Sequence, residues 1–132
     1  MCTPAAVLVI ESHPLMREAL CTAIASEPGL AVTAQLSSCE GAVQMASALK
    51  PDLILIALGN PGWDDLQTLH TLRQALPAVP ILALTTNEVL NQEQAALDAG
   101  ASSVVPKAVP REELIGKLQS LPRTHTPASS SS

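Results

Sequence analysis

Short apolar runs bounded by turn-forming residues recur along the chain, and longer amphipathic segments separate them. Such runs are typical of strands buried in a sheet. The run that contains Ala57 is apolar without interruption, with Pro51 and Asp52 before it and Gly59 to Gly62 after it. Its length and its boundaries favour a strand buried on both faces. The predicted strands are Ala5–Glu11, Leu30–Leu36, Leu53–Leu58, Ile81–Leu84 and Ser103–Pro106.

The segments between these runs carry apolar residues at the 3.6-residue spacing of amphipathic helices. Pro14 suits the first turn of the first helix, Ser38 or Glu40 opens the second, and Asp64 and Asp65 suit the start of the third. A weaker helix covers Asn91–Ala99 with Gly100 as its cap, and Pro110 opens the last. The residues expected to face the core are Leu15, Met16, Ala19, Leu20, Ala23 and Ile24, then Ala42, Val43, Ala46 and Leu49, then Leu66, Leu69 and Leu72, and finally Leu114, Ile115 and Leu118.

Strict alternation of strand and helix predicts an α/β fold in which a parallel sheet carries helices on both faces. The result is a doubly wound, three-layer (βα)5 sandwich. In sheets of this kind the ligand crevice lies beyond the carboxyl ends of the strands. The candidate site residues therefore follow the strands; they are Glu11 to His13, Ala57 to Gly62, Thr85 to Asn87, and Pro106 with Lys107.

Composition bounds the class of protein. A chain of 132 residues that is 47% hydrophobic forms one globular domain. We expect that domain to cover residues 1–120, and a flexible Ser/Thr/Pro-rich tail or linker to cover 121–132. A net charge of −5 without a basic cluster argues against direct nucleic-acid binding. No apolar run is long enough to span a membrane, and three cysteines without CxxC spacing predict reduced thiols in a cytoplasmic protein.

These residues, taken in order, resemble the receiver domain of bacterial two-component response regulators, of the NarL/FixJ type. The resemblance rests on VLVIESHPLMREAL, PDLILIALGNPG, LALTT, AGASSVVPK and VPREELIGKL, which together span about Val7 to Leu118. It implies a CheY-like, flavodoxin-like fold with strand order 2-1-3-4-5. It also implies that the chain is not an enzyme, and no Ser-His-Asp, Cys-His or glycine-rich phosphate motif contradicts this.

The resemblance assigns a degenerate phosphorylation site. The family's acidic pair falls on Glu11 and Ser12, and its phosphoacceptor aspartate falls on Ala57. The family's backbone metal carbonyl falls on Gly59, its switch hydroxyl on Thr85 and its phosphate-pairing lysine on Lys107, while the aromatic of the last strand falls near Val104. One acid of the pair, the acceptor and the aromatic are therefore altered.

Phosphoryl transfer needs a nucleophile and magnesium, and magnesium is held by carboxylates together with phosphate oxygens. A methyl group at Ala57 supplies neither, so we expect no cofactor and only weak or lost magnesium binding, with Glu11 as a weak candidate ligand. Asp52 lies at the wrong end of its strand to replace the acceptor, and Asp64 is a poor substitute. We expect Lys107 to pair with Glu11, the alternative being an exposed lysine.

Two further side chains each have two alternative interpretations. Thr85 is either a strand-end hydroxyl bonded to backbone or a residual switch residue. Trp63, the only aromatic residue of the chain, either covers the crevice or anchors a protein contact.

The sequence therefore predicts an atypical, unphosphorylated receiver, or pseudo-receiver, that acts by protein–protein contacts. The expected partners are a histidine kinase or an effector domain, and a second copy in a homodimer through the face of the last helices and last strand. A transcription-regulating DNA-binding domain would follow the Ser-rich tail, and the chain is either a fragment or a stand-alone adapter. The alternatives are a phosphorylatable receiver with a substitute acceptor and a small flavodoxin-like ligand-binding module.

Overall fold

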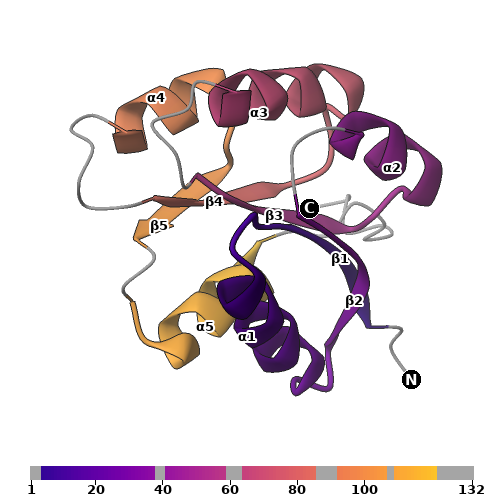
Figure 1. Cartoon of the computed structure of the whole chain (residues 1–132), viewed down its shortest axis with the longest axis vertical. Helices are drawn as coiled ribbons and strands as arrows, with labels where there is room; N and C mark the ends of the chain where they lie inside the picture. The colour runs from indigo at the N-terminus through magenta and orange to yellow at the C-terminus, as the bar shows by residue number, and fades with distance from the viewer. Residues whose placement is uncertain (1–3, 38–40, 59–63, 86–91, 107–108, 122–132) are drawn as a thin grey trace, which may run out of the picture.

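The fold is a five-stranded parallel sheet between two layers of helices (Figure 1). The computed structural model describes residues 4–37, 41–58, 64–85, 92–106 and 109–121. Strands and helices alternate from one end of the chain to the other, and the strand order is β2-β1-β3-β4-β5. The predicted fold class and strand order are confirmed.

Most boundaries lie within a residue or two of the predicted ones. The strands are β1 (Ala5–Ile10), β2 (Leu30–Leu36), β3 (Leu53–Ala57), β4 (Ile81–Thr85) and β5 (Ser103–Pro106). The helices are α1 (Pro14–Ala25), α2 (Ala42–Leu49), α3 (Asp64–Ala75), α4 (Gln92–Ala99) and α5 (Arg111–Ser120). The predicted openers of the second helix, Ser38 and Glu40, lie outside the described residues; α2 itself begins after Gly41.

Alternate residues of each strand enter two separate cores, because successive side chains point to opposite faces of the sheet. Leu53, Leu55 and Ala57 of β3 lie in the core beneath α1 and α5. Ile54 and Ile56 lie in the core beneath α2, α3 and α4. Figure 1 shows the same division, with α1 and α5 on one side of the sheet and the other three helices on the opposite side. Every residue of β3 and β4 is buried, as expected for central strands of a parallel sheet.

The expected inward face of α1 is wrong at its start. Leu20, Ala23 and Ile24 are buried, but Leu15 is 72% exposed, and Met16 and Ala19 are also exposed. The helix begins beyond the carboxyl end of β1, so its first turn extends past the sheet and has no strand beneath it. Periodicity identified the helix but could not show where the sheet ends.

The expected inward face of α2 is wrong at its end. Ala42 and Ala46 are buried and Val43 is partly buried, whereas Leu49 is exposed. On a helix of only eight residues, small alanines suffice to fill the space above the sheet. The larger Leu49 side chain therefore remains at the surface.

Candidate functional site

Of the predicted site residues that the structure describes, Glu11, Ala57 and Thr85 come together at the carboxyl edge of the sheet. Ile10 pairs with Ile56, so the next residues of those strands, Glu11 and Ala57, lie in neighbouring positions on adjacent chains. Ala57 in turn pairs with Leu84, and Thr85 follows directly. Parallel strands end at one edge, which explains why side chains from three separate segments meet there.

Ala57 presents only a methyl group at this edge. It is the last residue of β3 and only 7% exposed, and it belongs to the core beneath α1 and α5. The Leu58 N–H that follows donates to the carbonyl oxygen of Leu84 over 2.8 Å, which keeps the strand end close to β4. A carbon side chain in this position offers no lone pair to a metal and no nucleophile to a phosphoryl donor.

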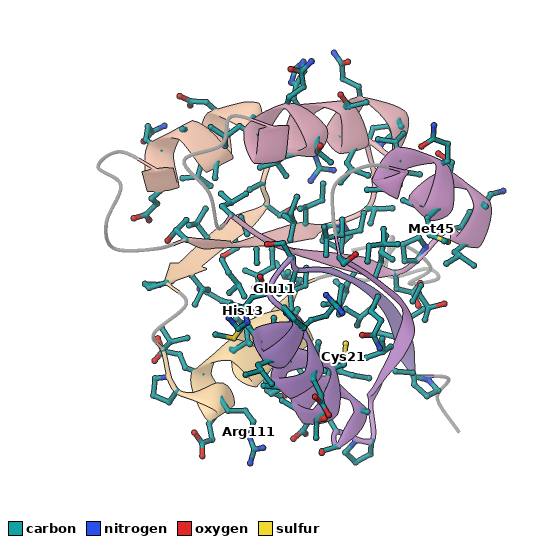
Figure 2. All side chains as sticks on the ribbon, in the orientation of Figure 1. Glu11, His13, Cys21, Met45 and Arg111 are labelled. Atoms are coloured by element: carbon teal, nitrogen blue, oxygen red, sulfur yellow. The ribbon has the colours of Figure 1, made fainter. Side chains whose placement is uncertain are left out.

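Glu11 is a buried acid that is already engaged in its own loop. Its side chain is 1% exposed, and its Oε2 accepts the backbone N–H of His13 over 3.0 Å. Its own N–H donates to the carbonyl oxygen of Leu36 over 3.0 Å. A carboxylate that accepts a backbone N–H is stabilised without a metal. Figure 2 shows Glu11 above the start of α1, with His13 close by.

The turn that follows Glu11 is tied to α1 by two further contacts. His13 is the N-cap of α1, and its Nδ1 accepts the Met16 N–H at 3.4 Å. Arg17 donates from Nη1 to the Glu11 carbonyl oxygen over 3.1 Å and from Nε to Gln35 Oε1 over 3.2 Å. The imidazole of His13 acts here as a helix cap, a role that the sequence did not suggest. The arginine joins the turn to β2.

The remaining predicted residues divide into those that are placed and those that are not. Ser12 is exposed, and Thr85 is buried at the end of β4. Val104 is partly buried and packs against the core beneath α2, α3 and α4. Gly59, Trp63 and Lys107 lie outside the described residues, so the expected Lys107–Glu11 pair stays a prediction.

The acid and thiol chemistry of the described residues is sparse. Among them, no three His, Cys, Asp or Glu side chains cluster closely enough to hold a metal ion. Cys21 lies on α1, partly buried, where burial raises the pKa of its thiol despite the opposing charge of Arg17. A raised pKa lowers the thiolate fraction, which makes Cys21 a poor nucleophile.

The amino edge of the sheet holds the polar network that the sequence did not reveal. Arg73, near the end of α3, donates Nε to the Gly100 carbonyl oxygen over 2.9 Å and Nη2 to Ser102 Oγ over 3.0 Å. Its Nη1 donates to three more carbonyl oxygens, those of Leu76, Pro77 and Val79. Burial lowers the pKa of the guanidinium, which nevertheless stays charged at neutral pH. Two partners distant in sequence, Gly100 and Ser102, distinguish Arg73 from a surface arginine.

Asp52 also belongs to this edge and not to the crevice. Its Oδ2 accepts the Ala6 N–H over 2.9 Å, and its own N–H donates to the Ala6 carbonyl oxygen over 2.8 Å. The prediction that Asp52 lies too far from Ala57 to replace it is confirmed.

Comparison with known proteins supports a single family. Residues 7–119 match the response regulator receiver domain. The nitrate/nitrite response regulator NarL of Escherichia coli K12 is 31% identical over 115 residues, which cover 87% of this chain and 53% of NarL. The response regulator MprA of Mycolicibacterium vanbaalenii is 31% identical over 124 residues, covering 94% of this chain and 53% of MprA. The chain thus spans about half the length of these relatives.

Solved structures show the same fold. A LuxR-family two-component response regulator from Aurantimonas superposes with a TM-score of 0.80 at 27% identity, covering 89% of this chain and 84% of that one. The receiver domain of a response regulator named NarL from Mycobacterium tuberculosis gives a TM-score of 0.81 at 23% identity, covering 89% and 95%. In the part of the chain that the structure describes, no helix has the length and apolarity to cross a bilayer.

Proposed function

Because this chain belongs to the response regulator receiver domain family, we propose that it is a pseudo-receiver, a receiver that no longer accepts a phosphoryl group and signals through protein contacts alone. Receiver domains are signalling modules that act through contacts with kinases and effector domains, and in general they are not enzymes. The proposal concerns how this member performs that role.

The observation that carries the proposal is the buried methyl group of Ala57 at the carboxyl end of β3. In-line phosphoryl transfer requires an oxygen nucleophile at the reacting position and a cation to neutralise the phosphoryl oxygens. The family's nucleophile position is occupied by carbon, and the second acidic position holds the exposed Ser12.

The contacts of Glu11 support the same conclusion about magnesium. Magnesium in such sites is held by one or two carboxylates together with phosphate oxygens and water. Glu11 is the one acid left of the family's pair, and its Oε2 already accepts the His13 N–H. Glu11 is a single carboxylate, and it is already hydrogen-bonded to the backbone of its own loop. Without a phosphate to share the ion, it binds magnesium weakly.

The partners that we propose are proteins: a histidine kinase or an effector domain, and a second copy of the chain. The relatives named above are about twice as long as the matched region, and we propose that this chain acts in transcription control through a DNA-binding domain. The cytoplasm is the compartment consistent with this role. The division into a receiver-like domain (1–120) and a tail (121–132) remains a prediction, since residues 122–132 lie outside the described part.

Phosphorylation chemistry tests the proposal directly. We expect the chain, incubated with acetyl phosphate and magnesium, to keep its intact mass, because no aspartate stands at the reacting position. A gain of one phosphoryl group that disappears in an Asp64→Asn variant would show a substitute acceptor and overturn the proposal. The receiver domain of E. coli NarL, treated in parallel, controls for the activity of the donor.

Beryllofluoride binding gives a second readout that needs no covalent step. We expect the fluorescence of Trp63, the only tryptophan, to stay unchanged when magnesium and beryllofluoride are added together. A saturable change would show that the pocket still binds a phosphoryl analogue. The same titration with flavins and nucleotides separates a pseudo-receiver from a ligand-binding module.

A further inference from the structure

We propose that the outer face of α2 is a self-association surface, where a second copy of this chain packs across a two-fold axis. This face consists of Met45, Ala48 and Leu49, which lie three and four residues apart and so share one side of the helix. The inference rests on the proposed function. A receiver that is not switched by phosphorylation must signal through a protein contact that forms without it.

The first observation is the unusual exposure of large apolar side chains on α2. Met45 is 37% exposed and Leu49 is 40% exposed, and Ala48 beside them is exposed as well. The buried side of the helix is made by the small Ala42 and Ala46. The larger apolar residues therefore point away from the core, which is the reverse of an ordinary surface helix. In Figure 2, Met45 projects from α2 on the side away from α3.

The second observation is charge. Among the described helices, α2 alone has no charged residue, its sequence being AVQMASAL. The chain as a whole carries −5, so two copies repel one another wherever acidic side chains meet. A contact through an uncharged face avoids both this repulsion and the cost of burying charges, and the cores of protein interfaces are depleted in charged residues and enriched in methionine.

The third observation is the strand beside this helix. β2 is an edge strand of seven residues, LAVTAQL, and contains neither a charged residue nor a proline. The opposite edge, β5, has only four residues and ends in Pro106. Charges and prolines are the usual means of protecting an edge strand from association, and β2 lacks both. The uncharged surface thus continues from α2 onto the edge of the sheet.

The register of β2 decides which part of this surface makes the contact. Val32 pairs with Val7 and Ala34 pairs with Leu8, which leaves Thr33 as an extra residue between them. A bulge of this kind bends an edge and interrupts strand pairing. Continuous pairing of two β2 strands is therefore disfavoured, and the helix supplies the main contact. Ala34 and Leu36, which are partly buried beneath the α2 layer, lie at its base.

A second copy fits this face better than other occupants do. Identical apolar surfaces are self-complementary across a two-fold axis and need no opposite charges to match. An anionic membrane would be attracted by a cluster of lysine or arginine; α2 itself has neither, and the exposed Lys50 that follows Leu49 is a single charge. Of the other large apolar residues that are exposed, Leu15 and Met16 lie beside the charged Arg17 and Glu18, and Leu97 is followed by Asp98.

The size of the contact predicts a weak dimer. A helix of eight residues is about 12 Å long, so its face places the interface at the small end of specific contacts. We expect a reversible dimer of the full chain whose population rises with protein concentration, measured by sedimentation velocity.

Three charge substitutions at similar exposure test which face is used. We expect Met45→Glu and Leu49→Glu each to raise the dimer dissociation constant by about tenfold or more. Leu97→Glu is the matched control, because Leu97 is 39% exposed on α4, close to the exposure of Met45 and Leu49. We expect it to leave dimerisation unchanged; loss of the dimer in this variant would instead favour the face of the last helices and last strand that the family resemblance implies. Circular dichroism and urea midpoints check that each variant is folded, and Met45→Ser replaces Met45→Glu if the latter unfolds.

Several outcomes overturn the inference. A wild-type chain that stays monomeric at the highest soluble concentration would do so, as would a dimer that Leu97→Glu disrupts and Met45→Glu does not. A dimer that strengthens when the chain is truncated after Leu121 would show that the tail occupies this surface instead. None of these measurements involves a phosphodonor. A failed dimer therefore leaves the pseudo-receiver proposal standing, and a phosphorylated chain leaves the dimer result standing.

Discussion

The two edges of the sheet use polar side chains in opposite ways. At the carboxyl edge, three strand ends bring together one acid, one methyl group and one hydroxyl, those of Glu11, Ala57 and Thr85. At the amino edge, the guanidinium of Arg73 alone donates five hydrogen bonds to segments from Leu76 to Ser102. Among the described residues, the side chains at the carboxyl edge make few contacts beyond their own turn, while Arg73 at the amino edge bonds to several segments.

The comparison shows that the residues needed for folding and the residues predicted for phosphorylation chemistry lie at different edges of the sheet. The hydrogen bonds of Arg73 satisfy backbone carbonyls at the junction of α3, α4 and β5. Losing them would remove this donor from the Gly100 and Val79 carbonyls, while the Leu76 carbonyl would keep the Val79 N–H. The methyl group of Ala57 packs in the core beneath α1 and α5 and carries no polar atom that needs a partner. An alanine at this position is therefore compatible with the fold, whatever chemistry the site has.

The largest effect is expected at the amino edge. We expect Arg73→Met to lower the free energy of unfolding by about 3 kcal/mol, because it leaves several partly buried carbonyl groups without a donor. Urea unfolding measures the change. Arg111→Met is the matched control, since Arg111 is exposed on α5, and it should change stability by no more than about 0.5 kcal/mol. Equal effects of the two substitutions would contradict the difference between the edges.

The next effect concerns the residue that packs against Arg73. Gly100 has φ +126°, and a Cβ there would lie 2.7 Å from Arg73 Cβ. We expect Gly100→Ala to cost about 2 kcal/mol, from backbone strain and from displacement of the arginine. In contrast, Gly116→Ala in α5, where a Cβ meets nothing within 4 Å, should stabilise the chain by about 0.5 kcal/mol. Thermal unfolding of both variants should show shifts of opposite sign.

A smaller and conditional effect is expected at the carboxyl edge. We expect Ala57→Asp to lower the free energy of unfolding by about 1–2 kcal/mol without metal, because it places a second carboxylate in a buried position beside Glu11. Magnesium should restore part of this loss, since it neutralises both acids, and it should leave the parent chain unchanged. Full phosphoryl switching is not expected from Ala57→Asp alone, because the resemblance to the family implies that Ser12 and Val104 are altered as well. Identical urea midpoints with and without magnesium for the variant would refute the expectation.

The smallest effect is a dependence on alkaline pH. Burial raises the pKa of the Cys21 thiol, so the folded chain favours the protonated form more than the unfolded chain does. The corresponding stability is fully present below the pKa of the unfolded thiol, about 8.5. It is lost as the pH rises through the higher folded value. We expect a shallow decline of the urea midpoint above that pH, reduced in Cys21→Ala; an unchanged decline in that variant would assign it to other groups.

The sequence by itself determined the family, the order of strands and helices and the identity of the residues at the carboxyl edge. Apolar runs such as Leu53–Leu58 define buried strands, and in a parallel sheet the residues that follow each strand must meet at one edge. The amino-acid sequence alone shows that position 57 is an alanine and not an acid. These conclusions depend on local pattern and on topology, and both are visible in one dimension.

Only the tertiary structure showed which polar side chains hold the fold together and which apolar helix residues lie at the surface. Arg73 is one of several arginines in the sequence, and two of its five acceptors, Gly100 and Ser102, become apparent only when α3, α4 and β5 are packed together. Leu15 and Leu49 fit an inward helical stripe, yet they are exposed, because the extent of the sheet beneath a helix is not a local property. A contact between residues distant in sequence leaves no periodic pattern, so it becomes visible only in three dimensions.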